Sequence, residues 1–225
     1  MSAPNGPPSR PDPIAVPVLA LPADDGSWWA VHPADYPGTS FNPNVGGAPA
    51  RPLPGGRFHP FDDADGARVP TRYLADHPNA AFAEVLFRGR PGKRRASLAA
   101  IRAHRLSQIR LVRALRVADL TGRDPATALG RALGADDSEV YPALRVVAAQ
   151  VHAHPDRLDG IVWDGVQLAT PGMRCLVLFG DRVDPSVDLS LTATVPIDEG
   201  PGLGRLVAAA DVRGVPLPES VLARR

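Results

Sequence analysis

The sequence predicts an α+β fold, in which strands and helices are mixed along the chain. The expected strands and helices follow one another without the regular β–α–β alternation of a doubly wound parallel sheet. The chain has 225 residues, 44% of them hydrophobic, and no internal repeat, which suits one sizeable core. We therefore predict a single domain over residues 16–225. Residues 1–15 begin with a Pro/Gly/Ser-rich stretch and are expected to be disordered.

The first half of the domain is expected to alternate short strands with loops. Residues 28–32 are an apolar run that predicts the first strand. Residues 36–54 are rich in Pro, Gly and Asn, which predicts a loop. Two further strands are predicted over residues 56–61 and 71–75, on either side of an acidic, glycine-containing turn at residues 62–67.

Three helices are predicted next to these strands. Asn79 to Arg88 reads as a helix with Pro78 in its first turn, where the missing N–H costs nothing. Residues 97–103 predict a second helix. Asp124 is expected to cap a short third helix whose first turn holds Pro125.

The second half of the domain is also expected to contain both strands and helices. Apolar and basic residues alternate over residues 108–120, which predicts one or two strands with arginines on the outer face. Residues 138–152 have apolar residues at helical spacing and give the clearest helix. Three more strands and a last helix are predicted over residues 160–163, 175–179, 187–195 and 203–210, respectively.

The charge of the chain is balanced overall but uneven locally. Net charge is +1, yet residues 88–116 contain ten basic residues and no acidic one. A solvated arginine face explains this run better than a nucleic-acid footprint, because only one aromatic residue lies nearby for stacking. The nucleic-acid interpretation nevertheless stays open.

Cys175 is the only cysteine, so no internal disulfide can form. Neither a signal peptide nor a membrane-spanning run is visible, which predicts a cytoplasmic location.

Common catalytic and metal-binding motifs are absent from the sequence. His152 and His154 lack a third ligand at zinc spacing, so we predict no metal. There is no Gly-x-Ser-x-Gly elbow and no Walker loop. The glycine-rich residues 200–204 are interpreted as the first turn of a helix.

Arg57, Tyr73 and Glu84 are the candidate site residues. Arg57 follows a glycine pair and offers planar donors that suit phosphate or carboxylate. Glu84 lies in an apolar, Ala-rich helical segment. Each has an ordinary alternative: a surface ion pair for Arg57, a core or rim aromatic for Tyr73, and the wet side of a helix for Glu84. Together they form the set that a site needs to hold a dinucleotide and break its glycosidic bond, and we expect them to line one cleft.

The order of several segments resembles the RES-domain family, named for its Arg, Glu and Ser. The similarity runs collinearly from about residue 28 to 181. The matching segments are Val31-His32, Phe41-Asn42-Pro43, Gly55-Gly56-Arg57-Phe58, Tyr73-Leu74-Ala75, Ala80 to Glu84, Val117-Ala118-Asp119-Leu120, Asp159-Gly160-Ile161-Val162-Trp163 and Cys175 to Phe179.

This resemblance implies a fold and an activity. The fold would be an ADP-ribosyltransferase-like core of two small packed β-sheets with flanking helices. The activity would be that of a bacterial toxin that consumes NAD, splits the nicotinamide–ribose bond and passes ADP-ribose to phosphate, water or a protein. Glu84 would be catalytic, while Arg57 and Tyr73 would bind NAD. The implied partner is an Xre-like helix-turn-helix antitoxin, through which alone nucleic acid would be contacted. No membrane partner is implied, and a homo-oligomer is compatible with the family.

Two positions depart from the family pattern. Gly165 stands at the NAD-binding position where the family has serine, and Ala30 stands where an arginine is usual before the Val-His pair. Both departures remove polar contacts to NAD. They favour an alternative in which the chain keeps the fold and binds its antitoxin or a nucleotide without turnover.

Overall fold

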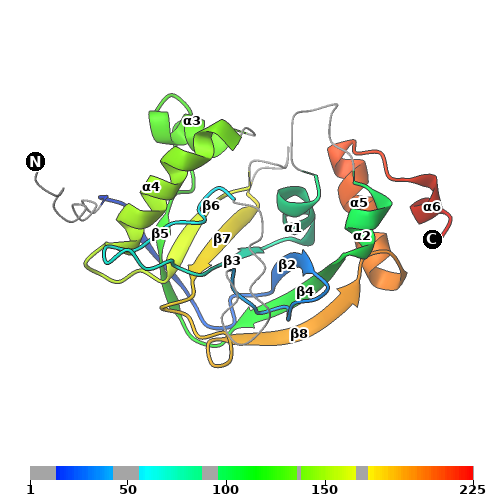
Figure 1. The fold of residues 1–225 in the computed structure, drawn as a ribbon, viewed down its shortest axis with the longest axis horizontal. Coiled ribbons are helices and arrows are strands. Elements are labelled where there is room, and N and C mark those ends of the chain that lie inside the picture. Colours follow the sequence, from blue (N-terminus) through cyan, green and yellow to red (C-terminus); the bar gives the residue numbers. More distant parts are fainter. Residues whose placement is uncertain (1–13, 43–55, 88–95, 136–137, 166–171, 225) are drawn as a thin grey trace, which may run out of the picture.

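The computed structural model describes residues 14–42, 56–87, 96–135, 138–165 and 172–224, and the structural statements below concern these residues. Their strands form one curled sheet in the order β1-β5-β6-β7-β3-β2-β4-β8 (Figure 1). The strands are β1 (Val18–Leu21), β2 (Trp28–Pro33), β3 (Thr71–Ala75), β4 (His104–Leu111), β5 (Leu115–Asp119), β6 (Gly160–Asp164), β7 (Arg174–Phe179) and β8 (Leu189–Pro196). The predicted mixture of strands and helices is confirmed. The two separate sheets are not observed, because hydrogen bonds join all eight strands.

The sheet is nevertheless weakly joined at its centre. Strands β2 and β3 share a single registered pair, Trp29 with Ala75. By contrast, β3 pairs with β7 along five positions and β2 pairs with β4 along six. The sheet therefore consists of two well-paired halves, β1-β5-β6-β7-β3 and β2-β4-β8, that meet at one narrow seam.

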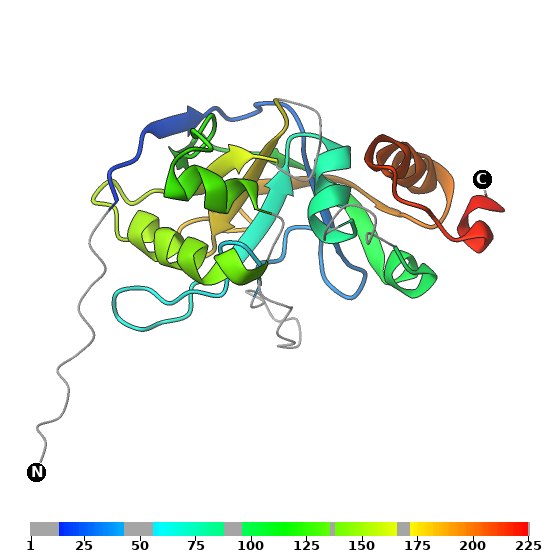
Figure 2. The same ribbon diagram turned by 90° about the horizontal axis from the view of Figure 1, so that it is seen from above.

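Six α-helices accompany the sheet, and Figures 1 and 2 show them gathered on one side of it. Helices α3 and α4 lie near β5 and β6, whereas α1, α2 and α5 lie near the β2-β4-β8 half. The helices are α1 (Pro78–Val85), α2 (Leu98–Arg102), α3 (Ala128–Gly134), α4 (Tyr141–His152), α5 (Gly200–Arg213) and α6 (Glu219–Leu222), with a short 3₁₀ turn at Ser138–Val140.

Helix α1 forms over the segment predicted for it, but it is shorter. The His77 side chain accepts a hydrogen bond from the Asn79 backbone N–H, which caps the first turn, and Pro78 occupies the first helical position. The helix ends at Val85, three residues before the predicted end at Arg88, which lies outside the described residues. Residues 80–84 are all buried, so one whole turn of α1 faces the core.

Two local predictions were wrong. Residues 56–61 form no strand; they contain a tight turn closed by an isolated bridge between Gly56 and His59. Helix α3 is capped by Thr127, whose hydroxyl accepts from the Gly130 N–H, and not by Asp124. Asp124 instead accepts from the Ala126 N–H in the preceding turn. An aspartate before a proline can cap a turn as well as a helix, and the sequence does not separate the two.

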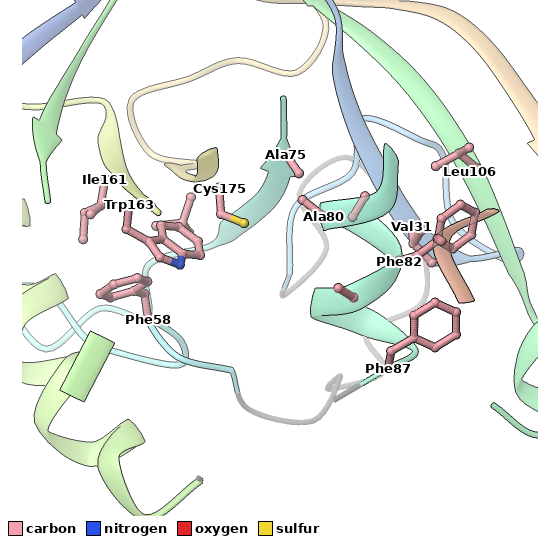
Figure 3. Packing of buried hydrophobic residues seen from close by; sticks show 14 of the residues in the cluster. Val31, Phe58, Ala75, Ala80, Phe82, Phe87, Leu106, Ile161, Trp163 and Cys175 are labelled. Carbon is pink, nitrogen blue, oxygen red and sulfur yellow. The ribbon is translucent and has the colours of Figure 1, made fainter. Parts of the chain in front are cut away.

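The sheet carries a hydrophobic core on each face. Alternation along β7 shows this directly, because Cys175, Val177 and Phe179 belong to one core cluster, whereas Leu176 and Leu178 belong to the other. The first cluster contains residues from all six helices, and Figure 3 shows part of it between β3, β6 and α1. The second cluster contains only strand and loop residues. Burial on both faces explains why β6 and β7 are nearly all apolar.

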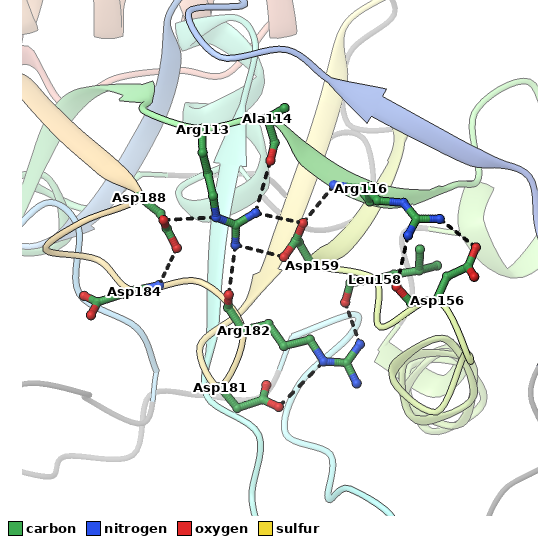
Figure 4. Close-up of polar contacts among 10 residues, drawn as sticks. All are labelled: Arg113, Ala114, Arg116, Asp156, Leu158, Asp159, Asp181, Arg182, Asp184 and Asp188. Carbon is green, nitrogen blue, oxygen red and sulfur yellow. Dashed lines mark hydrogen bonds and ion pairs between the residues drawn. The ribbon is translucent and has the colours of Figure 1, made fainter.

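A network of charges fastens the edge of the sheet where β6 begins (Figure 4). The Arg113 guanidinium donates two hydrogen bonds to the Asp159 carboxylate, at 3.0 and 3.2 Å, and contacts Asp188 at 3.0 Å. The hydrogen bonds to Asp159 raise the pKa of Arg113. Asp159 also accepts from the Arg116 backbone N–H at 2.8 Å, which ties the start of β6 to β5.

Replacement of Phe82 should test how strongly α1 is held. Its ring is fully buried and stacks on Phe87 with centroids 6.4 Å apart. Phe82→Ala should lower the free energy of unfolding by about 3 to 5 kcal/mol, because it removes contacts and leaves a cavity. Urea denaturation followed by circular dichroism measures this change. Val212→Ala, at an exposed position of α5, is the control; equal losses for both variants would contradict the packing described.

Candidate functional site

A cleft opens at the seam between the two halves of the sheet. Its walls come from β2, β3, β7 and α1. The lining residues are Trp29, Ala30, Val31, Tyr73, Leu74, Ala75, Ala81, Glu84, Val85 and Cys175. The enclosed space is about 20 Å³, enough for about one water molecule. A larger ligand could therefore reach only the mouth of this cleft unless side chains move.

Glu84 lies in this cleft and is 6% exposed. The alternative that it occupies the wet side of a helix is therefore wrong. It shares this cleft with apolar and aromatic residues, including Trp29 and Tyr73. A carboxylate in such surroundings can stabilise a nearby positive charge strongly, because little water screens it.

Tyr73 lines the same cleft, and its hydroxyl is already engaged. The hydroxyl oxygen accepts a hydrogen bond from the Phe58 N–H at 2.7 Å. The ring stands edge-on to His59, with centroids 5.2 Å apart, and to Trp163, at 5.9 Å. A Cβ at Gly56 would lie 2.7 Å from the His59 ring and 3.2 Å from the Tyr73 hydroxyl. Gly56 is thus required for close packing of this turn, whereas Gly55 lies outside the described residues.

Arg57 is not among the residues that line the cleft. It is 1% exposed, and its guanidinium donates to the carbonyls of Ala132, Leu133 and Ala135 at 2.8 to 3.2 Å. These carbonyls end helix α3, where a cation is favourable both as a donor and towards the helix dipole. The guanidinium also lies over the Tyr141 ring, 5.9 Å from its centroid. The structure therefore brings Tyr73 and Glu84 together and directs Arg57 to α3; the binding role of Arg57 stays a prediction.

Gly165 follows β6 and lies next to Cys175, which lines the cleft. Its N–H donates to the Met173 carbonyl at 2.8 Å, and it is not among the glycines with positive φ. A Cβ there would lie 3.3 Å from the Cys175 sulfur and 3.9 Å from Ala80. Cys175 and Ala80 face each other from β7 and α1 in Figure 3. A side chain at this position would therefore point at the cleft, with its neighbours yielding by a few tenths of an ångström.

The described part of the basic run is a set of surface ion pairs. Four of its arginines pair with aspartates. The pairs are Arg102 with Asp198, Arg110 with Asp24, Arg113 with Asp159 and Asp188, and Arg116 with Asp156. This arrangement fits the solvated face that the sequence favoured. Residues 88–95, which hold the other half of the run, lie outside the described ranges.

A buried polar chain on the opposite face of the sheet was not predicted. The His32 Nδ1–H donates to the Pro33 carbonyl at 2.9 Å, so Nε2 accepts from the Ser107 hydroxyl at 2.8 Å. Ser107 in turn lies 2.8 Å from the Thr194 hydroxyl. Burial, followed by the nearby charge of Arg72, lowers the pKa of His32 to about 4. Burial also lowers the pKa of Arg72, which donates to the Gly38 carbonyl, to about 10. The only sequence signal was the Val31-His32 pair.

Neither a metal site nor a membrane segment is found in the ranges that the structure describes. No group of three or more His, Cys, Asp and Glu side chains there could hold a metal ion. His152 binds Asp181 instead, with Nε2 and Oδ2 2.9 Å apart. No helix in these ranges is long and apolar enough to cross a membrane.

The chain belongs to the RES domain family. The family profile matches residues 27–198, which include all strands from β2 to β8 and every candidate site residue. No curated protein matches the chain. Among solved structures, a chain of the M. tuberculosis MbcT–MbcA toxin–antitoxin complex is similar, with a TM-score of 0.52 and 19% sequence identity. The match covers 84% of this chain and 88% of that chain, and at this identity it concerns the fold.

The pKa of His32 predicts how stability depends on pH. The folded value of about 4 lies below the ordinary 6.5, so the unfolded chain binds more protons between these values. Stability from this group is therefore complete above about pH 6.5 and is lost as pH falls towards 4, by about 3 kcal/mol. In His32→Gln, the rise of unfolding free energy with pH across this window should flatten. Urea titrations in a pH series, run beside wild type, measure it; parallel curves would contradict the assignment.

Proposed function

We propose that this RES-domain protein is the NAD-consuming toxin of a bacterial toxin–antitoxin pair. The reaction would cleave the nicotinamide–ribose bond and transfer ADP-ribose to phosphate, water or a protein. The observation that carries the proposal is that the buried Glu84 and Tyr73 line one cleft, where the sheet divides. Membership of the RES domain family supports it, as does the similarity to a chain of a toxin–antitoxin complex.

Glu84 would act on the charge that develops during cleavage. When the bond between ribose C1′ and the nicotinamide nitrogen breaks, its electron pair leaves with nicotinamide, and the ribose becomes oxocarbenium-like. The Glu84 carboxylate would stabilise this cation and accept a hydrogen bond from the ribose 2′-hydroxyl, as carboxylates do in glycoside cleavage. The acceptor atom of phosphate, water or a protein then bonds to C1′, and a proton carried by that atom passes to the solvent.

Tyr73 would offer its ring to the cationic nicotinamide. A positive ring system is attracted to an aromatic face, and the attraction strengthens where water is excluded. Its hydroxyl is held by Phe58, so the ring is fixed in place before a ligand arrives. Such pre-organisation lowers the cost of ordering the site during binding.

Arg57 and Gly165 complete the proposed NAD site. The Arg57 guanidinium holds three carbonyls of α3, so we assign it a positioning role for the wall formed by α3. At Gly165 a side chain would lie against the Cys175 sulfur, at 3.3 Å from its Cβ. The ADP-ribosyltransferase-like character of the fold is part of this proposal; the near-division of the sheet at β2 and β3 agrees with two small sheets.

The proposed partner is an Xre-like antitoxin in the cytoplasm. The similar structure is that of a toxin–antitoxin complex, which supports a protein partner of this kind. The ion-paired arginines of the described basic run support contact with nucleic acid only through that partner. A homo-oligomer is compatible with these features.

A second candidate function is binding without turnover. Gly165 and Ala30 favour it, because each lacks a polar side chain that would contact NAD. Incubation of the purified protein with NAD, with and without phosphate, separates the two functions by product analysis. Release of nicotinamide supports the enzyme, whereas intact NAD with measurable binding supports the second candidate.

Glu84→Gln tests the catalytic role. The substitution keeps the shape and removes the charge, so NAD turnover should fall by roughly 100-fold or more while the fold is kept. Nicotinamide release is measured beside circular dichroism of the same samples. Glu219→Gln, at an exposed position of α6, is the matched control and should keep wild-type turnover. Wild-type turnover in Glu84→Gln would remove Glu84 from the mechanism.

Gly165→Ser tests whether the missing serine limits this chain. Its hydroxyl would add one hydrogen bond to the ligand, worth about 1 kcal/mol, so NAD affinity or turnover should rise about fivefold. Since φ at Gly165 is not positive, the melting temperature should stay close to wild type. Gly165→Ala adds the Cβ without the hydroxyl and should give no gain. Unchanged turnover with unchanged melting in the serine variant would refute the idea. In that case Asp164 or Gln167 would already supply the polar contact to the ligand that the serine was expected to add. Gln167 lies outside the described residues.

A further inference from the structure

The cleft can admit a ligand larger than water only if one of its walls moves. It encloses about 20 Å³, and its lining residues are buried except for Trp29, Tyr73 and Val85. The Tyr73 hydroxyl is held by the Phe58 N–H. Val85 is a β-branched residue in the last position of α1, and such side chains strongly prefer one rotamer in a helix. Trp29 is therefore the wall side chain that is left to move.

The movement of Trp29 is confined to its side chain, because its backbone is fixed on both sides. Trp29 pairs with Ala75 of β3 and with Gln108 of β4. Its neighbour Trp28 is 1% exposed in the core on the opposite face of the sheet. The Trp29 ring packs only partly buried against the core on the helix face. A rotation of this indole between side-chain rotamers would widen the cleft and leave the sheet intact.

Arg205 of α5 lies over this indole. Its guanidinium carbon is 4.2 Å from the centroid of the Trp29 ring, well within the roughly 6 Å over which a cation is attracted to an aromatic face. The Arg205 side chain is exposed, and within the described residues it makes no ion pair or hydrogen bond. The indole is thus the partner that the structure gives to this cation.

Helix α5 gives Arg205 a fixed base. The helix packs against α1, which lies beside it in Figure 1, and buries Leu206 and Val207 next to Arg205. Near its start, a Cβ on Gly202 would lie 1.9 Å from the Pro196 carbonyl oxygen, so the helix sits directly on the end of β8. Residue 205 follows the segment 27–198 that the family profile matches, so the contact with Trp29 is not part of that profile.

We propose that the Trp29 indole is the gate of the cleft and that Arg205 is the positioning residue that holds this gate closed. The inference rests on the proposed function only for its purpose, which is to control access to Glu84. The closed indole keeps water from the carboxylate, and the open indole admits a ligand. A cation over a partly exposed ring makes a weak contact, so removal of Arg205 shifts the balance between closed and open by only a few fold.

Cys175 reports opening of the gate without any ligand. It is the only cysteine of the chain, lines the cleft and is 1% exposed. The rate at which iodoacetamide alkylates its thiol, followed by mass spectrometry, therefore measures how often the cleft opens. Arg205→Gln should raise this rate about two- to fivefold. Arg224→Gln is the matched control, because it removes an exposed guanidinium that pairs with Asp198, and it should keep the wild-type rate.

A double variant tests whether Arg205 acts through Trp29. Trp29→Leu removes the indole and should raise the alkylation rate of Cys175 by more than Arg205→Gln does. Adding Arg205→Gln to Trp29→Leu should then change nothing further, because the ring on which the guanidinium acts is gone. Equal rates in wild type and Arg205→Gln overturn the proposal, as does an Arg205→Gln effect that persists in the Trp29→Leu background.

Two further measurements separate the gate from a general loss of stability. Arg205→Lys keeps a cation above the ring and should stay close to the wild-type rate. In Arg205→Gln, the rate should hardly depend on low concentrations of urea, since movement of one side chain exposes little surface, whereas global unfolding exposes much. A steep urea dependence, or an Arg205→Lys rate equal to that of Arg205→Gln, overturns the gate. These results hold even if the protein cleaves no NAD, in which case only the proposed turnover fails.

Discussion

The single pair between Trp29 and Ala75 determines where this molecule can have a site. Strands that stay paired leave no room between them, whereas β2 and β3 have no further registered pair from Ala75 back towards the amino end of β3. Helix α1 lies over the divergence, and its alanines allow it to sit close to both strands. Glu84 on the same helix thereby lines the same cleft as Tyr73. The weakness of the seam and the position of the carboxylate are therefore parts of one arrangement.

Arg57 shows how a buried cation can support a site without touching its cleft. Burial of a guanidinium is costly unless its donors find acceptors, and here carbonyls at the carboxyl end of α3 accept from both terminal nitrogens of Arg57. The adjacent Phe58 donates to Tyr73, so one short turn holds both the α3 wall and the aromatic ring of the cleft. Removal of this arginine would loosen both walls, and an effect on ligand binding would not require direct contact.

The sequence predicted the elements better than their junctions. Apolar periodicity located β6, β7 and α4, because their side chains are buried in a regular pattern. It could not show the single-pair seam, since register between strands depends on contacts distant in sequence. The residues Tyr73 and Glu84 were found through a motif, and their common cleft was expected. The α3 partner of Arg57, about 75 residues away, and the His32–Ser107 pair left no local signal.

Strand β6 explains why the chemistry is expected at one end of the sheet. Its amino end is fixed by Asp159, which Arg113 and the Arg116 N–H hold. Its centre is fixed by Trp163, whose ring is fully buried against Phe58 at a centroid distance of 4.9 Å. Its carboxyl end borders a space lined by Asp164 and Leu120, and Gly165 after it lies next to Cys175, which lines the cleft. A rigid strand that ends beside the cleft gives this wall a fixed position, which is the condition for aligning a bound ligand with a buried carboxylate.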